Sequence, residues 1–213
     1  MFKRFSICYI LFMFCITGTS AQEDRWTGNA TNLSKGNLRV NSSGRYLEYS
    51  DGTPFLYMGD TAWELISRLN DKETELYLEN RREKGFTVIQ TVILDELDDM
   101  DVSSNGEPKL IDGNIDKPAP GYFTHVDKVI SLAAAKGLYI ALLPTWGDKV
   151  DKQWGKGPEI FTPENAYRYG KWLGERYMNA SNLIWIIGGD RSGDGKNFAI
   201  WNALATGIKS VDK

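Results

Sequence analysis

Residues 88–94 read VIQTVIL and residues 138–143 read LYIALL, two short runs in which nearly every residue is apolar. Two further runs of this kind are FLYM at 55–58 and LIWII at 183–187. Continuous rather than alternating hydrophobicity is typical of parallel strands, which are covered on both faces. The sequence therefore predicts a sheet of four parallel strands.

Helical patterns separate these runs and follow the last one. They are a capping box at 70–73 (NDKE), apolar residues at helical spacing over 123–134, a cap with a first-turn proline at 162–164 (TPE), and a second apolar pattern over 198–208. Each pattern has the start or stop signals of a helix. Four β–α units in succession predict an α/β domain.

The part of the chain before residue 50 has a different character. Lys3 and Arg4 precede an apolar run and the small residues at 19–21, which predicts a signal peptide over residues 1–21. We expect residues 22–37 to form an exposed segment, and residues 38–40 and 46–49 to form a β-hairpin before the domain, which we place at 38–213. The predicted location is secreted or periplasmic, with no membrane association after cleavage.

Composition excludes several kinds of chemistry. Both cysteines, Cys8 and Cys15, lie in the predicted signal peptide, so the mature chain would have no thiol for catalysis, disulfides or zinc. The formal charge of −3 does not suit a nucleic-acid partner. The single histidine, His125, lies within a helix pattern, and no phosphate-binding glycine loop is present. We therefore expect no metal and no cofactor.

Polar and aromatic residues follow the predicted strands, where parallel α/β folds place their functional groups. They are Asp60 and Trp63 after the first run, Asp95 and Glu96 after the second, Trp146 and Asp148 after the third, and Asp190 and Arg191 after the fourth. Indole faces stack on sugar rings, and carboxylates bind hydroxyls and transfer protons. This combination favours a carbohydrate ligand.

Asp190 is the strongest catalytic candidate, because it follows an uncharged strand and two glycines. Arg191 beside it offers a structural alternative, in which the two form an ion pair. Residues 190–195 also resemble the start of a calcium loop, but Trp201 stands where that loop needs a glutamate, so we predict no metal here.

Longer segments that contain these residues resemble a known family. They are DGTPFLYMGDTAWELISRLN (51–70), YLENRREKGFTVIQTVIL (77–94), YFTHVDKVISLAAAKGLYIALLPTWGDKV (122–150), GPEIFTPENAYRYGKWLGERY (157–177) and LIWIIGGDRSGDGKNFAIW (183–201). Together, over Leu38 to Lys209, they resemble the apiosidase-like catalytic domain of glycoside hydrolase family 140.

The resemblance implies a (β/α)8 TIM barrel that cleaves apiose linkages of a pectic polysaccharide. It also implies a retaining mechanism, with an acid/base carboxylate after the fourth strand and a nucleophile after the seventh. The acid/base of the family motif falls on Asp190. Asp60, Trp63, Trp146, Asp148 and Arg191 are then candidate substrate-binding residues.

Four β–α units correspond to the N-terminal half of such a barrel. Retaining hydrolysis needs two carboxylates about 5–5.5 Å apart, so we expect this chain to be an incomplete and inactive fragment of a glycoside hydrolase. The alternative is a non-catalytic carbohydrate-binding protein, or a half-barrel that self-associates to cover its edge strands.

Overall fold

The computed structural model describes residues 27–96 and 102–212, so the predicted signal peptide lies outside the described residues. The elements are β1 (Leu38–Val40), β2 (Leu47–Tyr49), β3 (Gly59–Thr61), α1 (Leu65–Arg68), α2 (Asp71–Glu83), β4 (Val88–Leu94), α3 (Pro120–Ala135), β5 (Tyr139–Thr145), α4 (Pro163–Tyr177), β6 (Leu183–Trp185) and α5 (Phe198–Lys209). Short 3-10 turns lie at Leu33–Lys35, Ile111–Gly113, Gly147–Lys149 and Gly195–Asn197. Among the helices of the described residues, none has the length and hydrophobicity of a membrane span.

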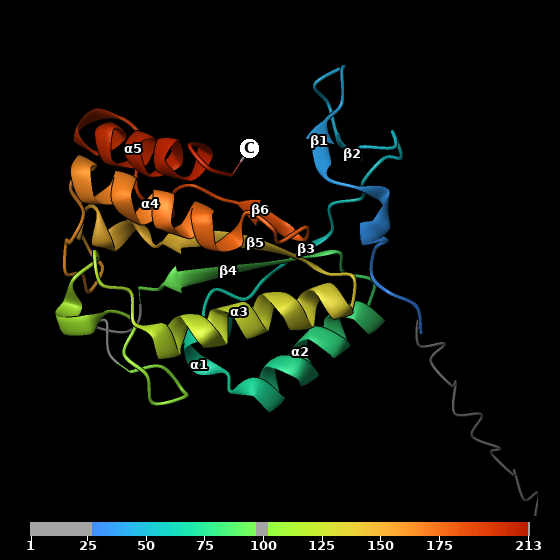
Figure 1. Cartoon of the computed structure of the whole chain (residues 1–213), viewed down its shortest axis with the longest axis horizontal. Coiled ribbons are helices and arrows are strands. Elements are labelled where there is room, and N and C mark those ends of the chain that lie inside the picture. The colour runs from blue at the N-terminus through green and yellow to red at the C-terminus, as the bar shows by residue number, and fades with distance from the viewer. Residues whose placement is uncertain (1–26, 97–101, 213) are drawn as a thin grey trace, which may run out of the picture.

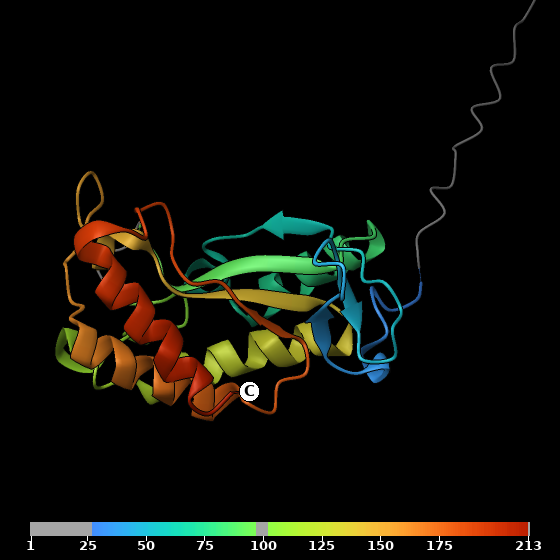
Figure 2. The same ribbon diagram turned by 90° about the horizontal axis from the view of Figure 1, so that it is seen from above.

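The main sheet has four parallel strands in the order β3-β4-β5-β6. Its helices lie on one face, and the β1–β2 hairpin lies at the end where the strands begin (Figures 1 and 2). The four predicted β–α units and the preceding hairpin are confirmed. The carboxyl ends of the strands meet at the opposite edge of the sheet, which positions the loops described below.

The first strand lies later in the sequence than predicted. We expected it at Phe55–Met58, but β3 is Gly59–Thr61. The amide of Phe55 donates to Leu47 of the hairpin, and the Phe55 ring packs against Tyr49 and Tyr139, with centroids 5.5 and 5.1 Å apart. The hydrophobicity of this run therefore serves the packing of the hairpin, and pairing with β4 begins only where it ends.

The helices begin and end for reasons visible in the sequence. The side chain of Asn70 accepts from the amide of Glu73, whose carboxylate accepts from the amide of Asn70, and this capping box starts α2. Between α4 and α5, a Cβ on Gly170 would lie 2.3 Å from the Leu204 carbonyl oxygen, and one on Gly207 would lie 2.2 Å from the Tyr167 oxygen. The two glycines therefore allow these helices to pack closely.

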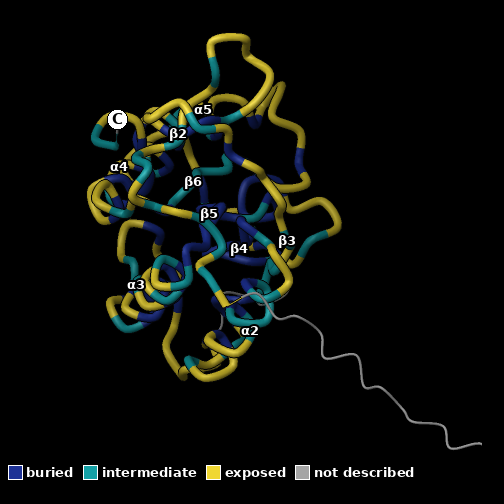
Figure 3. Tube along the Cα trace, turned by 90° about the vertical axis from the view of Figure 1, so that its right-hand side faces the viewer, coloured by how far each residue is buried: buried dark blue, intermediate teal, exposed yellow. Residues whose placement is uncertain are grey.

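Two apolar clusters enclose the sheet. The larger lies between the sheet and the helices, and the smaller lies on the opposite face near the hairpin, where it consists of Tyr49, Phe55, Val88, Tyr139 and Ala141. Figure 3 shows the buried segments gathered around β4 and β5. Burial on both faces explains why these two strands are continuous apolar runs.

The described part of the segment expected to be exposed, residues 27–37, contacts the domain at several points. The Ala30 amide donates to the Lys136 oxygen, and the Thr31 hydroxyl donates to the Gly137 oxygen at 2.6 Å. The guanidinium of Arg82 reaches the Gly28 oxygen. Exposed and half-buried residues alternate here, because the segment lies across the ends of α2 and α3.

Candidate functional site

Two tryptophans form the centre of the edge at which the strands end. Trp63 follows β3 and Trp146 follows β5, and their ring centroids lie 5.2 Å apart at an interplanar angle of 54°. The amide of Trp146 donates to the Leu94 carbonyl at the end of β4, which fixes the backbone at the start of the loop after β5. Both rings are half-buried. The structure therefore brings together two of the predicted residues that are 83 positions apart in the sequence.

The tryptophans line a cavity of about 130 Å³. Val92 lies in its wall, and three acidic residues complete the lining, namely Glu64, Asp95 and Glu96. An aromatic wall with carboxylates at the rim can stack on an apolar sugar face and accept hydrogen bonds from hydroxyls.

Asp60 lies inside β3 rather than after it, because the strand begins later than predicted. It pairs in register with Ile89 of the helix-side core. Its carboxylate accepts from the Tyr77 hydroxyl at 2.6 Å and pairs with Arg81, both of α2. Burial and then the bond to Asp60 raise the pKa of Tyr77 to about 12. Asp60 thus bridges β3 and α2, and its substrate-binding role stays a prediction.

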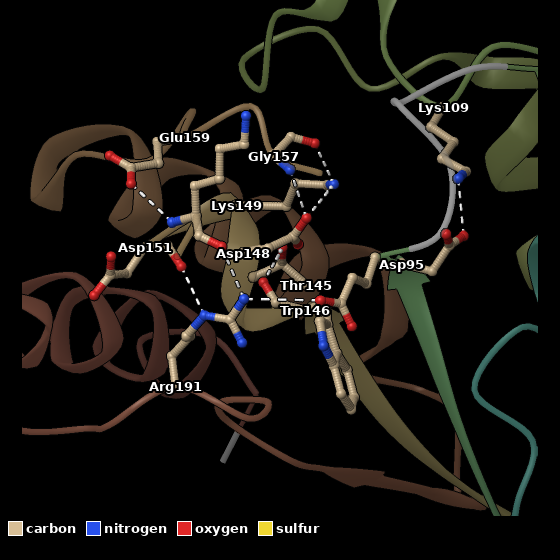
Figure 4. A network of polar contacts seen from close by, with 12 residues as sticks. Asp95, Lys109, Thr145, Trp146, Asp148, Lys149, Asp151, Gly157, Glu159 and Arg191 are labelled. Carbon is tan, nitrogen blue, oxygen red and sulfur yellow. Dashed lines mark hydrogen bonds and ion pairs between the residues drawn. The ribbon is translucent and has the colours of Figure 1, made fainter. Parts of the chain in front are cut away.

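Asp148 is fully buried together with its neighbour Lys149, although we had predicted it to bind substrate. One carboxylate oxygen accepts from the Lys149 ammonium at 3.0 Å and from the Gly157 amide at 2.7 Å, as Figure 4 shows. Lys149 also donates to the Gly157 carbonyl. The pair therefore holds residues 147–157 in a closed loop, and contact with substrate stays a prediction for Asp148.

Arg191 connects two loops through a guanidinium that is not exposed at all. Nε donates to the Asp151 oxygen at 2.7 Å and Nη2 to the Lys152 oxygen at 2.9 Å (Figure 4). A Cβ on Gly147 would lie 2.4 Å from Arg191 Cγ, and a Cβ on Gly155 would lie 3.0 Å from Nη2. The two glycines leave the space that this side chain fills.

Asp190 accepts a hydrogen bond from Nη1 of Arg191, and its side chain is 33% exposed. The Nη2 atom of the same guanidinium lies 3.7 Å from a Glu96 oxygen in the cavity wall. A Cβ on Gly189 would lie 3.3 Å from the Trp146 ring. The predicted acid/base therefore adjoins the tryptophan cavity and keeps an open side for a ligand.

The side chain of Asp151 makes further contacts between these two loops. Its carboxylate accepts from Gln153 at 3.0 Å and from Asn197 at 3.3 Å, and Lys196 lies 3.3 Å away. These contacts, led by the Gln153 hydrogen bond, hold the pKa of Asp151 below its ordinary value.

Asp95 lies at the end of β4 and is buried with Lys109, whose ammonium donates to it at 2.8 Å (Figure 4). Lys109 belongs to the chain between β4 and α3, where bridges join Val102 to Pro108 and Leu110 to Pro118. The ion pair therefore fastens this segment over the end of β4.

Several residues at this edge are not among the predicted site residues. Glu64 and Glu96 line the tryptophan cavity, Lys149 has no signal apart from its neighbour Asp148, and Trp154 lies in a polar loop. Trp154 is 70% exposed, and its ring lies under the Arg191 guanidinium at 4.0 Å. A tryptophan among polar residues was the signal that could have identified it. His125, set aside as a base, is buried and contacts Asp71 at 3.1 Å.

Comparisons with solved structures agree with this architecture. A crystal structure of a glycoside hydrolase family 5 protein from Bacteroides vulgatus is 33% identical, with a TM-score of 0.76 over 87% of this chain and 39% of that one. A second structure, named a glycoside hydrolase, is 40% identical, with a TM-score of 0.75 over 85% of this chain and 40% of that one. The chain thus spans about 40% of the length of these relatives.

The barrel architecture extends to more distant structures. The catalytic domain of a Thermobifida fusca endoglucanase is 15% identical, with a TM-score of 0.55 over 87% of this chain and 53% of that one, a likeness in fold alone. The four β–α units therefore match part of a glycoside hydrolase TIM barrel, as predicted. A comparison with functionally curated proteins found no match.

The family itself follows from the sequence match. Residues 41–213 match the family model described as "Apiosidase-like, catalytic domain", a range that begins after β1 and includes β2 and all four β–α units. This chain belongs to the apiosidase-like catalytic domain family of glycoside hydrolases.

Proposed function

We propose that the chain is the substrate-binding half of a secreted or periplasmic enzyme that cleaves a pectic polysaccharide by an apiosidase-like, retaining mechanism. The observation that carries this proposal is the Trp63–Trp146 pair, which lines a cavity bordered by carboxylates at the strand ends. Asp190 adjoins that cavity through the guanidinium of Arg191.

In this proposal Asp190 is the acid/base. A group that protonates a leaving oxygen must reach the ligand, and the Asp190 side chain is partly exposed whereas Asp95 and Asp148 are buried. Arg191 sets the position of Asp190, because its own guanidinium is fixed by the carbonyls of Asp151 and Lys152.

Double displacement also needs a nucleophilic carboxylate on the other side of the scissile bond. We propose that this group comes from outside the four β–α units, so the 213-residue chain alone binds the glycan but does not hydrolyse it. The chain covers 39% and 40% of the two glycoside hydrolase structures compared above, which supports this division.

The test combines binding and turnover on the 213-residue chain. In affinity gel electrophoresis, soluble rhamnogalacturonan pectin should retard the protein and a β-glucan should not, and Trp63→Ala should abolish the retardation. Release of apiose should be absent in the same preparations. Equal mobility in both gels would overturn the binding proposal, and sustained apiose release would overturn the proposed inactivity.

A second function, self-association, is favoured by the edges of the sheet. Within the described residues, β3 and β6 each have a strand neighbour on one side only. A groove of about 450 Å³ runs beside β6 and the hairpin, on the side away from the tryptophan cavity. Unpaired edges pair readily with another chain. Sedimentation should then give a dimer, and a monodisperse monomer would contradict this function.

A further inference from the structure

We propose that the β1–β2 hairpin of one copy of this chain inserts its tip into the groove beside β6 of a second copy, which docks its own tip in return. The tip is residues 41–46, which read NSSGRY. The inference rests on self-association, the second of the functions proposed above, and it identifies the surface that makes the contact. The hairpin lies where the strands begin, so the tryptophan cavity at the other end of the strands takes no part.

The groove has apolar side chains on both of its walls. It has a volume of about 450 Å³ and lies between β1 on one side and the start of β6, with the turn before it, on the other. Val40 of β1 is 65% exposed, and Met178, which follows α4, is 52% exposed. A single exposed apolar residue is ordinary on a protein surface, but two that face one groove favour a site that another protein covers.

The tip of the hairpin is held in one shape by its own hydrogen bonds. The amide of Asn41 donates to the Tyr46 oxygen at 2.9 Å, and the amide of Gly44 donates to the Asn41 oxygen at 2.8 Å. The Asn41 side chain accepts from the amide of Ser43 at 2.9 Å and donates to Glu48. A tip that is already ordered loses little conformational entropy when it docks.

The tip also carries an aromatic anchor. Tyr46 is 46% exposed, and Figure 1 shows the hairpin standing apart from the main sheet and its helices. Aromatic rings supply a large contact area and are enriched among the residues that dominate protein interfaces. The Tyr46 ring is therefore placed where a second molecule can bury it.

The charges of the tip and of the groove are complementary. Arg45 in the tip is exposed and forms no ion pair with the residues that the structure describes. Asp212 lines the groove and accepts from the Trp185 indole at 2.7 Å, but it has no cationic partner within residues 27–96 and 102–212. The other charged residue of the lining, Arg39, is neutralised by Glu48 at 2.9 Å. A docked tip thus brings an unpaired cation to a groove that contains an unpaired anion.

The position of the tip allows the contact to be reciprocal. The tip continues directly from β1, which itself lines the groove. A two-fold axis between two hairpins can therefore place each tip in the groove of the other copy, and the assembly closes as a dimer in which each contact occurs twice. The docked tips would also cover Leu183 and Ile184, on the edge of β6 that has no strand neighbour among the described residues.

Sedimentation velocity of the 213-residue chain over a range of concentrations measures the dissociation constant of the dimer. Tyr46→Ala should raise this constant by about 100-fold, tenfold for each of the two contacts. Met178→Lys, in the groove, should have a similar effect. Arg45→Gln should raise the constant by about threefold for each contact, and high salt should remove this difference.

A mixing experiment separates docking of the tip from other modes of association. Tyr46→Ala has a defective tip and an intact groove, and Met178→Lys has the reverse. A mixed dimer keeps one complete contact, whereas a dimer of either variant with itself keeps none. An equal mixture should therefore associate more tightly than either variant alone. Tyr167→Ala, at an exposed tyrosine of α4, is the matched control and should behave as the parent. Circular dichroism verifies that each variant is folded.

The outcomes distinguish this inference from the functions proposed above. If the parent is a dimer that neither Tyr46→Ala nor Met178→Lys weakens, or if the mixture gains nothing, the docking surface is wrong while self-association stands. A dimer that is lost in Leu56→Lys but kept in Tyr46→Ala would use the opposite edge of the sheet, beside β3, and would overturn this inference. If the parent is a monomer, self-association fails and this inference fails with it, whereas the carbohydrate function is tested separately by the pectin gels.

Discussion

The strand-end loops and the helix layer use charged residues in opposite ways. In the loops, Lys149 and Asp148 are both 0% exposed, and Lys109 and Asp95 are 0% and 3% exposed. At the surface of the helix layer, Arg168 of α4 forms a bidentate pair with Asp116, which precedes α3, and the two side chains are 56% and 40% exposed. The sheet and the helices are held together by apolar packing, whereas the strand-end loops also bury ion pairs.

This difference shows what fixes a functional loop. A buried ion pair adds little net stability relative to an apolar pair, but removal of one partner leaves an uncompensated charge. Each buried pair here also binds backbone or closes a segment, as Lys149 does with Gly157. We therefore expect the loss of one buried partner to destabilise the loops strongly and the loss of an exposed one to affect the helix layer little.

The largest expected effect is at the buried pair. Lys149→Met should lower the free energy of unfolding by about 3–5 kcal/mol, because Asp148 stays buried without its cation. Urea unfolding measures the change. Lys171→Met is the control, since Lys171 pairs with Glu175 at the surface at 3.7 Å, and it should have almost no effect. Equal losses of unfolding free energy in the two variants would contradict the difference between the strand-end loops and the helix layer.

A second test concerns the space in the loop rather than its charge. Gly155→Ala should cost about 1–3 kcal/mol, because its Cβ would overlap that of Asp148. Gly193→Ala is the matched control, since a Cβ at Gly193 meets nothing within 4 Å. Thermal unfolding compares the variants, and a Gly155→Ala protein as stable as the control would show that the loop is not tightly fixed.

On the helix layer the expected effect is small. Arg168→Ala breaks both hydrogen bonds to Asp116, yet it should cost only about 0.2–1 kcal/mol because water solvates both groups. Urea unfolding at low and high salt measures this, and salt should shrink the difference. A cost comparable to that of Lys149→Met would show that the helix layer also depends on its ion pairs.

The smallest effect is a pH dependence at the helix layer. Hydrogen bonds from Arg82 and then Lys136 lower the pKa of Glu79 from 4.5 to about 2. Its stabilising contribution is therefore complete above pH 4.5 and is lost as the pH falls toward 2. Glu79→Gln should flatten this part of the acid-unfolding curve. An unchanged curve between these pH values would show that Glu79 has the same pKa in the folded and unfolded chains.

Local signals predicted most of the fold. The predicted capping box starts α2, and the predicted cap with a first-turn proline starts α4. The apolar runs at 88–94 and 138–143 contain most of β4 and β5. The run at 55–58 was misassigned because hydrophobicity does not reveal which neighbour buries it. Phe55 packs with the hairpin, so only the pairing of β3 with β4 sets where the first strand begins.

The candidate site was predicted less completely. Placement of Trp63 and Trp146 at one edge follows from parallel strands, and the structure brings the two rings together. The strand order does not predict the direction in which the side chains of Asp60 and Asp148 point. Successive strand residues face opposite sides of the sheet, and a loop residue can fold inward. Trp154 was missed because it meets the site through Arg191, a contact between separate loops. Glu96 lines the tryptophan cavity directly and also approaches Arg191.

The amino-acid sequence by itself determined the order of the β–α units, the helix caps and the family, because these depend on neighbours a few positions apart or on long matching segments. Tertiary structure alone decided which charges are buried, which face of β3 carries Asp60, and which side chain stacks on the Trp154 ring. Those features depend on contacts between separate segments of the chain, from Asp60 with Tyr77, 17 positions apart, to Arg191 with Asp151, 40 positions apart. No local pattern contains them, since the energy of a buried charge depends on what the rest of the chain places beside it.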